Sequence, residues 1–280
     1  MKFAISKQLQ TYAVAVAAAA LVTLAAGSAA LADGTSIEDQ EIWKSIATDL
    51  YGDNAKITET DTQISLDAPY RALDAAIVPL KMTIPAEWSG KVKRLTLVVD
   101  KNPAPVVARF EFGKAAGLGE RSISTRVRVD MYSNVRAIAE MKDGSLFMTT
   151  KYVKAAGGCS APALKDMDAA LDNVGKMKIR HQASVSSSLT EEAQVMIRHP
   201  NYSGMQMNQV TGFYIPAKFV EHIEVRKGKA LVFKLTGGIS LSEDPNIRFT
   251  YASGGNDPLH VSARDTDGKV FEMTAKRVGS

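Results

Sequence analysis

Residues 123–131 read ISTRVRVDM, and this stretch decides the fold class. Ile123, Val127 and Met131 fall in one phase of a period of two, and serine, arginine and aspartate side chains fill the other phase. Successive side chains of a β-strand point to opposite faces of a sheet. The alternation therefore predicts a strand with one buried face and one solvent-facing face.

The same period of two recurs on both sides of this stretch. Towards the N-terminus it runs through residues 94–99 and 107–112, and towards the C-terminus through 135–141 and 145–153. The last two segments are joined by Asp143-Gly144, which predicts a hairpin because both turn residues can take positive φ. After residue 175 the alternation returns in further segments, at 177–181, 195–199, 223–225, 231–235, 247–251 and 259–263.

Many short strands without alternating helices favour an all-β chain. We expect two immunoglobulin-like antiparallel β-sandwich domains, one over residues 33–154 and one over residues 176–280. Between them, residues 155–175 are small, polar and glycine-bearing, which is typical of a linker. We expect a short helix in this linker, led by Ser160 and Pro162, because both residue types favour helix starts.

A helix also precedes the first strands. Ser36 followed by Asp39 is a helix-start pattern, and Trp43, Ile46 and Leu50 then follow at the spacing of one buried helix face. We expect this N-terminal helix to pack across an edge or an end of the first sandwich.

Residues 1–32 have the features of a secretory signal peptide. Lys2 gives a basic start, residues 12–26 form an apolar run, and residues 30–32 (Ala-Leu-Ala) supply the small-x-small cleavage pattern. The apolar run is shorter than the about 20 residues that a membrane span needs. We therefore expect cleavage after Ala32, export to the periplasm and no membrane attachment of the mature protein. A retained N-terminal anchor is the alternative.

The single cysteine of the chain, Cys159, is the leading candidate for chemistry. An exported protein with one cysteine cannot use it for an internal disulfide, so the thiol is reactive or intermolecular, and a disulfide dimer through Cys159 is available. Gly157 and Gly158 remove side-chain bulk and permit unusual backbone angles, so they predict a hinge that lets this segment enter a narrow cleft. An incidental linker cysteine is the alternative.

The surroundings of Cys159 predict a mobile, solvent-accessible thiolate. If a helix begins near Ser160, the thiol lies at its positive end, and Lys151 and Lys154 are close in sequence. Both features would lower the pKa of the thiol below about 8.5, its usual value.

Other kinds of site find little support in the sequence. The formal net charge is +4 without a long run of one sign, which argues against nucleic-acid binding. No two histidines have the spacing of a local zinc site, and we expect all four in the core or at an interface. They are His181, His199, His222 and His260. We expect no metal, no cofactor and no catalytic residue, and therefore a protein that is not an enzyme.

Several motifs resemble two known families, in order along the chain. The N-terminal motifs are ISLDAP (64–69), AIVPL (76–80), DKNP (100–103), TRVR (125–128), SNVRA (133–137) and VKAAGGC (153–159). The C-terminal motifs are MKIR (177–180), IRHP (197–200) and IPAKFV (215–220). The first set resembles SoxY and the second resembles SoxZ, which together form the sulfur carrier of the periplasmic thiosulfate-oxidising pathway.

This resemblance implies a function for Cys159. In the family, the cysteine of a Gly-Gly-Cys arm binds sulfur intermediates covalently and presents them to separate periplasmic sulfur-oxidation enzymes. Cys159 is thereby implied as the covalent carrier residue for thiosulfate-type cargo. The fused arrangement is similar to SoxYZ-like carriers associated with quinoprotein dehydrogenases. The alternative function is therefore a non-catalytic accessory or interaction protein for a periplasmic PQQ (quinoprotein) dehydrogenase.

The sequence departs from SoxY after the cysteine. The SoxY arm ends its chain as Gly-Gly-Cys-Gly-Gly, whereas here Ser160-Ala161-Pro162 follows and a second domain comes after it. An arm that is held at both ends sweeps a smaller volume than a free tail. This departure affects how far Cys159 can reach into a deep, narrow active site.

Overall fold

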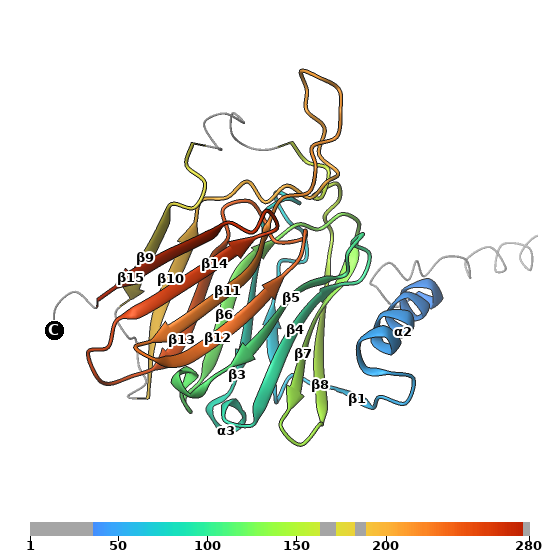
Figure 1. Cartoon of the computed structure of the whole chain (residues 1–280). Helices are drawn as coiled ribbons and strands as arrows, with labels where there is room; N and C mark the ends of the chain where they lie inside the picture. The colour runs from blue at the N-terminus through green and yellow to red at the C-terminus, as the bar shows by residue number, and fades with distance from the viewer. Residues whose placement is uncertain (1–35, 163–171, 183–188, 277–280) are drawn as a thin grey trace, which may run out of the picture. The chain divides into compact units, whose positions relative to one another are not determined.

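The computed structural model describes residues 36–162, 172–182 and 189–276 (Figure 1). We refer to residues 37–162 as the N-terminal half and to residues 172–276 as the C-terminal half. Both halves belong to one structural unit that begins at Ile37. The predicted signal peptide and most of the predicted linker helix lie outside the described residues.

Strands dominate both halves. The N-terminal half contains α2 (Ile37–Tyr51), β1 (Ile57–Glu59), β2 (Ser65–Asp67), β3 (Val78–Ile84), α3 (Ala86–Ser89), β4 (Val92–Val99), β5 (Val106–Phe112), the 3-10 helix η1 (Lys114–Ala116), β6 (Arg121–Val127), β7 (Ser133–Met141) and β8 (Leu146–Val153). The C-terminal half contains β9 (Met177–Gln182), β10 (Thr190–Ile197), β11 (Val220–Lys227), β12 (Ala230–Gly237), β13 (Asn246–Ala252), β14 (Leu259–Asp265) and β15 (Val270–Ala275). No described helix combines the length and apolar character that a membrane span requires.

The described strands form two layers (Figure 1). One is a nine-stranded sheet in the order β1-β8-β7-β4-β5-β12-β11-β14-β15, and the other is a six-stranded sheet in the order β2-β3-β6-β13-β10-β9. Neighbouring strands are antiparallel except for the β1–β8 pair. This confirms the all-β sandwich architecture. The predicted hairpin at Asp143-Gly144 joins β7 and β8, although only Gly144 has a positive φ, of 89°.

The two halves share both sheets. Strand β5 of the N-terminal half pairs with β12 of the C-terminal half, and β6 pairs with β13. The sequence predicts two separate sandwiches, whereas in the structure the strands of both halves form two continuous sheets, because one pair of strands joins the halves in each layer. Pairing covers the edges of these strands, which would otherwise expose unpaired backbone N–H and C=O groups.

One hydrophobic core runs across this junction. It joins buried residues of both halves in a single cluster. At its centre, the Phe233 ring lies 5.9 Å from the Phe110 ring and 5.0 Å from the Phe249 ring, both in edge-on geometry. We call the β5–β12 and β6–β13 pairs, together with these three rings, the sheet joint.

Helix α2 has the predicted buried face. Ile46 is buried, and Trp43 and Leu50 pack beside it on a small cluster that is separate from the main core. The helix lies on the outer face of the nine-stranded sheet near its β1 edge, where it covers Val98 and Ile138. Strands β4 and β7 are apolar on both faces at this point, because they face the core on one side and α2 on the other.

Candidate functional site

The segment that follows β6 forms a receptor for the Gly-Gly-Cys stretch. The alternation predicts a strand that continues to Met131, but β6 ends at Val127. The Val129 N–H donates to Ala75 O at 2.8 Å, and Val129 O accepts a 3.0 Å hydrogen bond from the Gly158 N–H. We refer to residues 155–161 as the arm, and its backbone is therefore docked on residues 128–130 like a short extra strand.

Asn102 fixes the shape of this receptor. Its side chain is buried, its Nδ2 donates to Arg128 O at 2.8 Å, and its Oδ1 accepts from the Asp130 N–H at 2.9 Å. One amide thus satisfies backbone groups on both sides of Val129. This explains structurally why an asparagine stands in the motif of residues 100–103.

The two glycines of the arm serve different needs. Gly157 has a φ of +77° in open space, and its N–H donates to Asp130 O at 2.8 Å. A Cβ on Gly158 would lie 2.1 Å from Ala75 O and 2.6 Å from Val129 O, so no side chain fits there. Gly157 supplies a backbone angle that favours glycine, and Gly158 supplies close approach.

Cys159 is sequestered in this docked arm. Cys159 is fully buried, and its backbone N–H donates to Oδ1 of Asp130 at 3.3 Å. Burial raises the pKa of the thiol to about 12; the Asp130 carboxylate also raises it and the Arg128 guanidinium lowers it. The thiol is protonated at neutral pH. The predicted solvent-accessible thiolate is therefore wrong for this conformation.

The lysines that motivated that prediction point to other partners. The Lys154 ammonium lies over the Tyr70 ring, 4.6 Å from its centroid. Lys151 lines a separate groove. Closeness in sequence therefore does not place either ammonium at the sulfur, where the charged groups that act are Asp130 and Arg128.

Arg128 is the cation next to the arm, and the sequence pattern does not identify it. Although it stands in the polar phase of residues 123–131, it is only 2% exposed. Its Nη1 donates to Gly158 O at 3.1 Å and its Nη2 donates to Asn201 O at 3.4 Å. Among the described residues, Nε of Arg128 is buried without a partner. A guanidinium from one half thus ties the arm to the other half.

The C-terminal half holds the arm from its far side. The Ser203 hydroxyl donates to Cys159 O, and Nε2 of Gln206 donates to Ala161 O at 3.0 Å. Both side chains are buried. We call Arg128, Asn201, Ser203 and Gln206 the arm clasp.

Asn201 organises the clasp from within the C-terminal half. It is fully buried with a φ of +43°, its N–H donates to Nδ1 of His199 at 3.1 Å, and its Oδ1 accepts from the Val220 N–H at 3.1 Å. His199 is itself buried with its Nε2 3.5 Å from Asp265, and burial lowers its pKa. His199 is therefore a core histidine, as expected, that supports the clasp.

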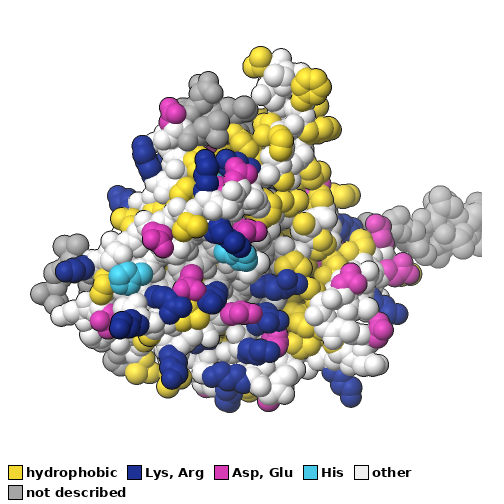
Figure 2. Space-filling view, in the orientation of Figure 1, with side chains coloured by type: hydrophobic (Ala, Val, Ile, Leu, Met, Phe, Trp, Pro, Cys, Tyr) yellow, Lys and Arg dark blue, Asp and Glu magenta, His cyan; other side chains and the backbone are white. Residues whose placement is uncertain are grey.

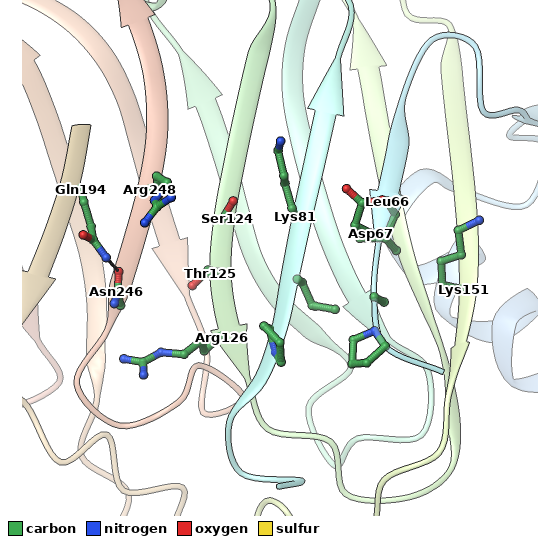
Figure 3. A pocket seen from close by; sticks show the side chains of 14 residues that line it. Leu66, Asp67, Lys81, Ser124, Thr125, Arg126, Lys151, Gln194, Asn246 and Arg248 are labelled. Atoms are coloured by element: carbon green, nitrogen blue, oxygen red, sulfur yellow. Dashed lines mark hydrogen bonds between the residues drawn. The ribbon is translucent and has the colours of Figure 1, made fainter. Parts of the chain in front are cut away.

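A shallow groove of about 650 Å³ crosses the outer face of the six-stranded sheet (Figure 3). Ser124 of β6 pairs with Lys81 of β3 on one side and with Arg248 of β13 on the other, so the two cations stand two strands apart. Arg126 adds a third positive charge, and Asp67 is the one acidic residue of the lining. We call this the basic groove, and both halves contribute to it.

Two family models match the chain. The model described as sulfur oxidation protein SoxY matches residues 47–159, and the model described as sulphur oxidation protein SoxZ matches residues 179–276. The chain belongs to the SoxYZ family, with both parts fused in tandem. The SoxY match ends at Cys159, the residue that the arm clasp encloses. SoxY and SoxZ proteins are carrier or accessory proteins, and this assignment supports a carrier role in sulfur oxidation.

Solved structures show weaker likeness to this SoxYZ chain. The sulfur carrier protein SoxY from Chlorobium limicola f thiosulfatophilum is 20% identical, with a TM-score of 0.33, over 41% of this chain and 93% of that chain. A superoxide reductase (neelaredoxin) from Ignicoccus hospitalis is 13% identical, with a TM-score of 0.29, over 35% of this chain and 93% of that chain. A search of curated proteins found no match. The assignment therefore rests on the two family models.

Proposed function

We propose that this SoxYZ protein is a periplasmic carrier that binds thiosulfate-type sulfur intermediates covalently on Cys159 and presents them to partner enzymes. The observation that supports this proposal most directly is the built receptor around the arm. Residues of both halves converge on the backbone of residues 157–161, next to the one thiol of the chain. The signal-peptide features of residues 1–32 support export to the periplasm.

The docked conformation is the resting state in this proposal. A protonated, buried thiol is a poor nucleophile, because the thiolate is the reactive form. Loading therefore requires the arm to leave the clasp. An open arm exposes the sulfur and returns the pKa of the Cys159 thiol towards about 8.5.

The loading step then balances with a two-electron acceptor. The Cys159 thiol loses its proton, and its sulfur forms a bond with the outer sulfur of thiosulfate. A partner redox protein takes up two electrons, which leaves a Cys159-S-S-SO₃⁻ adduct. A hydrolytic partner adds water, releases sulfate and two protons, and leaves a persulfide anion on Cys159.

A loaded arm favours the open state. The receptor holds the Cys159 side chain without exposed surface, so a larger adduct overfills it. The adduct also carries a negative charge, which is costly to bury beside the Asp130 carboxylate that contacts the cysteine N–H. Loading of the thiol is thereby coupled to release of the arm from the clasp, and the bound sulfur group stays accessible to the next enzyme.

The loop that clasps the arm also offers a surface to partners. Between Ser203 and Ile215 this loop exposes Val210, Phe213 and Tyr214, at 94%, 76% and 67%. Exposed aromatic side chains are typical of protein interaction sites. A partner that binds this loop can displace Ser203 and Gln206 and so release the arm where it is needed.

The carrier proposal is tested by intact mass measurement on protein isolated from its own cells without reductant. We expect wild-type protein to carry a sulfur-containing adduct that dithiothreitol removes, and the Cys159→Ser protein to carry none. Unmodified wild-type protein from cells that are oxidising thiosulfate would overturn the proposal.

The second candidate is an accessory interaction protein for a periplasmic quinoprotein dehydrogenase. The burial of Cys159 favours it, because a buried thiol is not presented to partner enzymes. The basic groove also favours it, because a positively charged face shared by both halves suits an acidic partner. This candidate predicts a complex that survives Cys159→Ser and is weakened by Lys81→Glu with Arg248→Glu. The carrier proposal predicts loss of function with Cys159→Ser alone.

A further inference from the structure

A second pocket lies on the outer face of the nine-stranded sheet, beside the C-terminal end of helix α2. Its volume is about 660 Å³, within the range of about 300–1,000 Å³ that is common for small-molecule sites. Leu50 and Tyr51 of the helix form one wall. Figure 2 shows acidic and basic side chains interleaved over this face of the molecule.

A row of four polar side chains crosses this pocket. The register pairs Thr96 of β4 with Arg109 of β5, Arg109 with Thr236 of β12, and Thr236 with His222 of β11. With strands about 4.8 Å apart, the row spans roughly 15 Å. Two of its members come from each half, so the pocket exists because β5 and β12 pair.

The acidic side chains of the pocket already have basic partners. Glu111 lies 3.1 Å from Arg94, and Glu224 contacts Arg226 and lies 3.4 Å from Lys234. These pairs account for both carboxylates in the lining.

Arg109 has no such partner. No carboxylate of the described part of the chain lies within salt-bridge distance of its guanidinium. The other two arginines of the lining are paired, Arg94 with Glu111 as described above and Arg264 with Glu221 at 3.0 Å. The Arg109 guanidinium is therefore left without an ion-pair partner among the described residues. An unpaired guanidinium favours a carboxylate-like or sulfonate-like ligand, because its planar fork can donate two parallel hydrogen bonds.

The pocket also offers neutral donors and an apolar surface. Tyr51 is hydrogen-bonded with Thr96, and burial raises the pKa of its phenol, so it stays protonated. Thr236 is an exposed residue and is the register partner of Arg109. Leu50 and the Tyr51 ring supply the apolar contacts that a purely inorganic ion would not use.

We propose that this pocket binds a small organic anion, with its carboxylate or sulfonate group on Arg109 and its carbon part against Leu50 and Tyr51. The site is distinct from Cys159 and does not depend on the carrier proposal. It gives the fused chain a ligand site that neither half contains alone.

The test is calorimetric titration of the full-length mature protein with benzenesulfonate, benzoate and sulfate. We expect one site per chain for both aromatic anions, with weaker binding of sulfate. Arg109→Gln should weaken binding about tenfold or more, since it removes a charged bidentate contact. Tyr51→Phe, which keeps the ring, should weaken it about fivefold.

The matched control is Arg71→Gln, because Arg71 is an exposed arginine that lines neither this pocket nor the basic groove. It should leave the affinity unchanged. Amide NMR shifts on titration should appear at Thr96 and Thr236 and not at Gly158. No saturable binding, or binding that Arg109→Gln and Tyr51→Phe leave unchanged, would overturn the proposal. Sulfate binding as tight as that of the aromatic anions would overturn the claim that the ligand is organic, with its carbon part against Leu50 and Tyr51.

Discussion

Two of the contacts between the halves of this SoxYZ chain, the sheet joint and the arm clasp, differ greatly in strength. The sheet joint consists of two backbone ladders over a continuous core that contains Phe110, Phe233 and Phe249. The arm clasp consists of a few side-chain bonds to the backbone of the arm. A single hydrogen bond contributes only about 1 kcal/mol net, whereas a core of this size folds cooperatively. This difference in strength indicates that the arm can open while the halves remain joined.

The largest effect is expected at the sheet joint. Phe249 is fully buried against Phe233, so Phe249→Ala should lower the free energy of unfolding by about 3–5 kcal/mol. Urea denaturation measures it. Phe213→Ala is the control, because Phe213 is 76% exposed and should change stability by less than about 0.5 kcal/mol. Equal effects of the two substitutions would show that the joint does not hold the halves together.

The next largest effect is expected from blocking arm docking. A methyl group at position 158 meets Ala75 O, so Gly158→Ala should open the arm and speed labelling of Cys159 by about 10- to 100-fold. Iodoacetamide labelling at pH 7.5 measures it. In Gly157→Ala the added methyl meets open space and only backbone strain remains, so the increase should be smaller. Identical labelling rates in wild type and Gly158→Ala would contradict the docked arm.

The pH dependence of labelling separates a docked thiol from a free one. Because the pKa of docked Cys159 is raised to about 12, docking is undisturbed below about pH 8.5 and weakens as pH rises from there towards 12. The thiolate forms only in the open arm, so labelling should rise about tenfold per pH unit even above pH 8.5. Urea-unfolded protein, the control, should reach a plateau near that pH. A plateau at the same pH in native protein would mean an ordinary, exposed thiol.

The smallest effect is expected from a single bond of the clasp. Ser203→Ala removes the hydroxyl that donates to Cys159 O, and about 1 kcal/mol corresponds to labelling about fivefold faster. Ser160→Ala is the matched control, since Ser160 is an exposed residue whose hydroxyl bonds within the arm itself, to Gly157 O at 3.3 Å. The control should label at the wild-type rate, and a Ser203→Ala rate equal to it would remove Ser203 from the clasp.

The sequence predicts the strands well because side-chain alternation is a local property. The buried face of α2 is predicted for the same reason, but its position over Val98 and Ile138 follows only from the structure. Pairing between β5 and β12 is different, because it joins residues more than 100 positions apart and leaves no local pattern. The shared sheets therefore follow only from the structure.

The candidate site divides in the same way. Cys159 and its two glycines stand out in the sequence, since Cys159 is the one cysteine of the chain and ends the stretch VKAAGGC that resembles SoxY. The alternation predicts that Arg128 faces solvent, but it is buried, because the alternation ends where β6 ends at Val127. Ser203 and Gln206 carry no sequence signal, because their role depends on a loop that meets the arm from the other half.

The most direct test of the account is native-state labelling of Cys159 as a function of low urea concentration. If the arm opens locally, the labelling rate in the folded baseline should be nearly independent of urea, because little surface is exposed on opening. The free energy of opening should then be several kcal/mol smaller than that of global unfolding. A labelling rate that rises with the full urea dependence of unfolding would contradict the account, because Cys159 would then become accessible only when the joined sheets unfold.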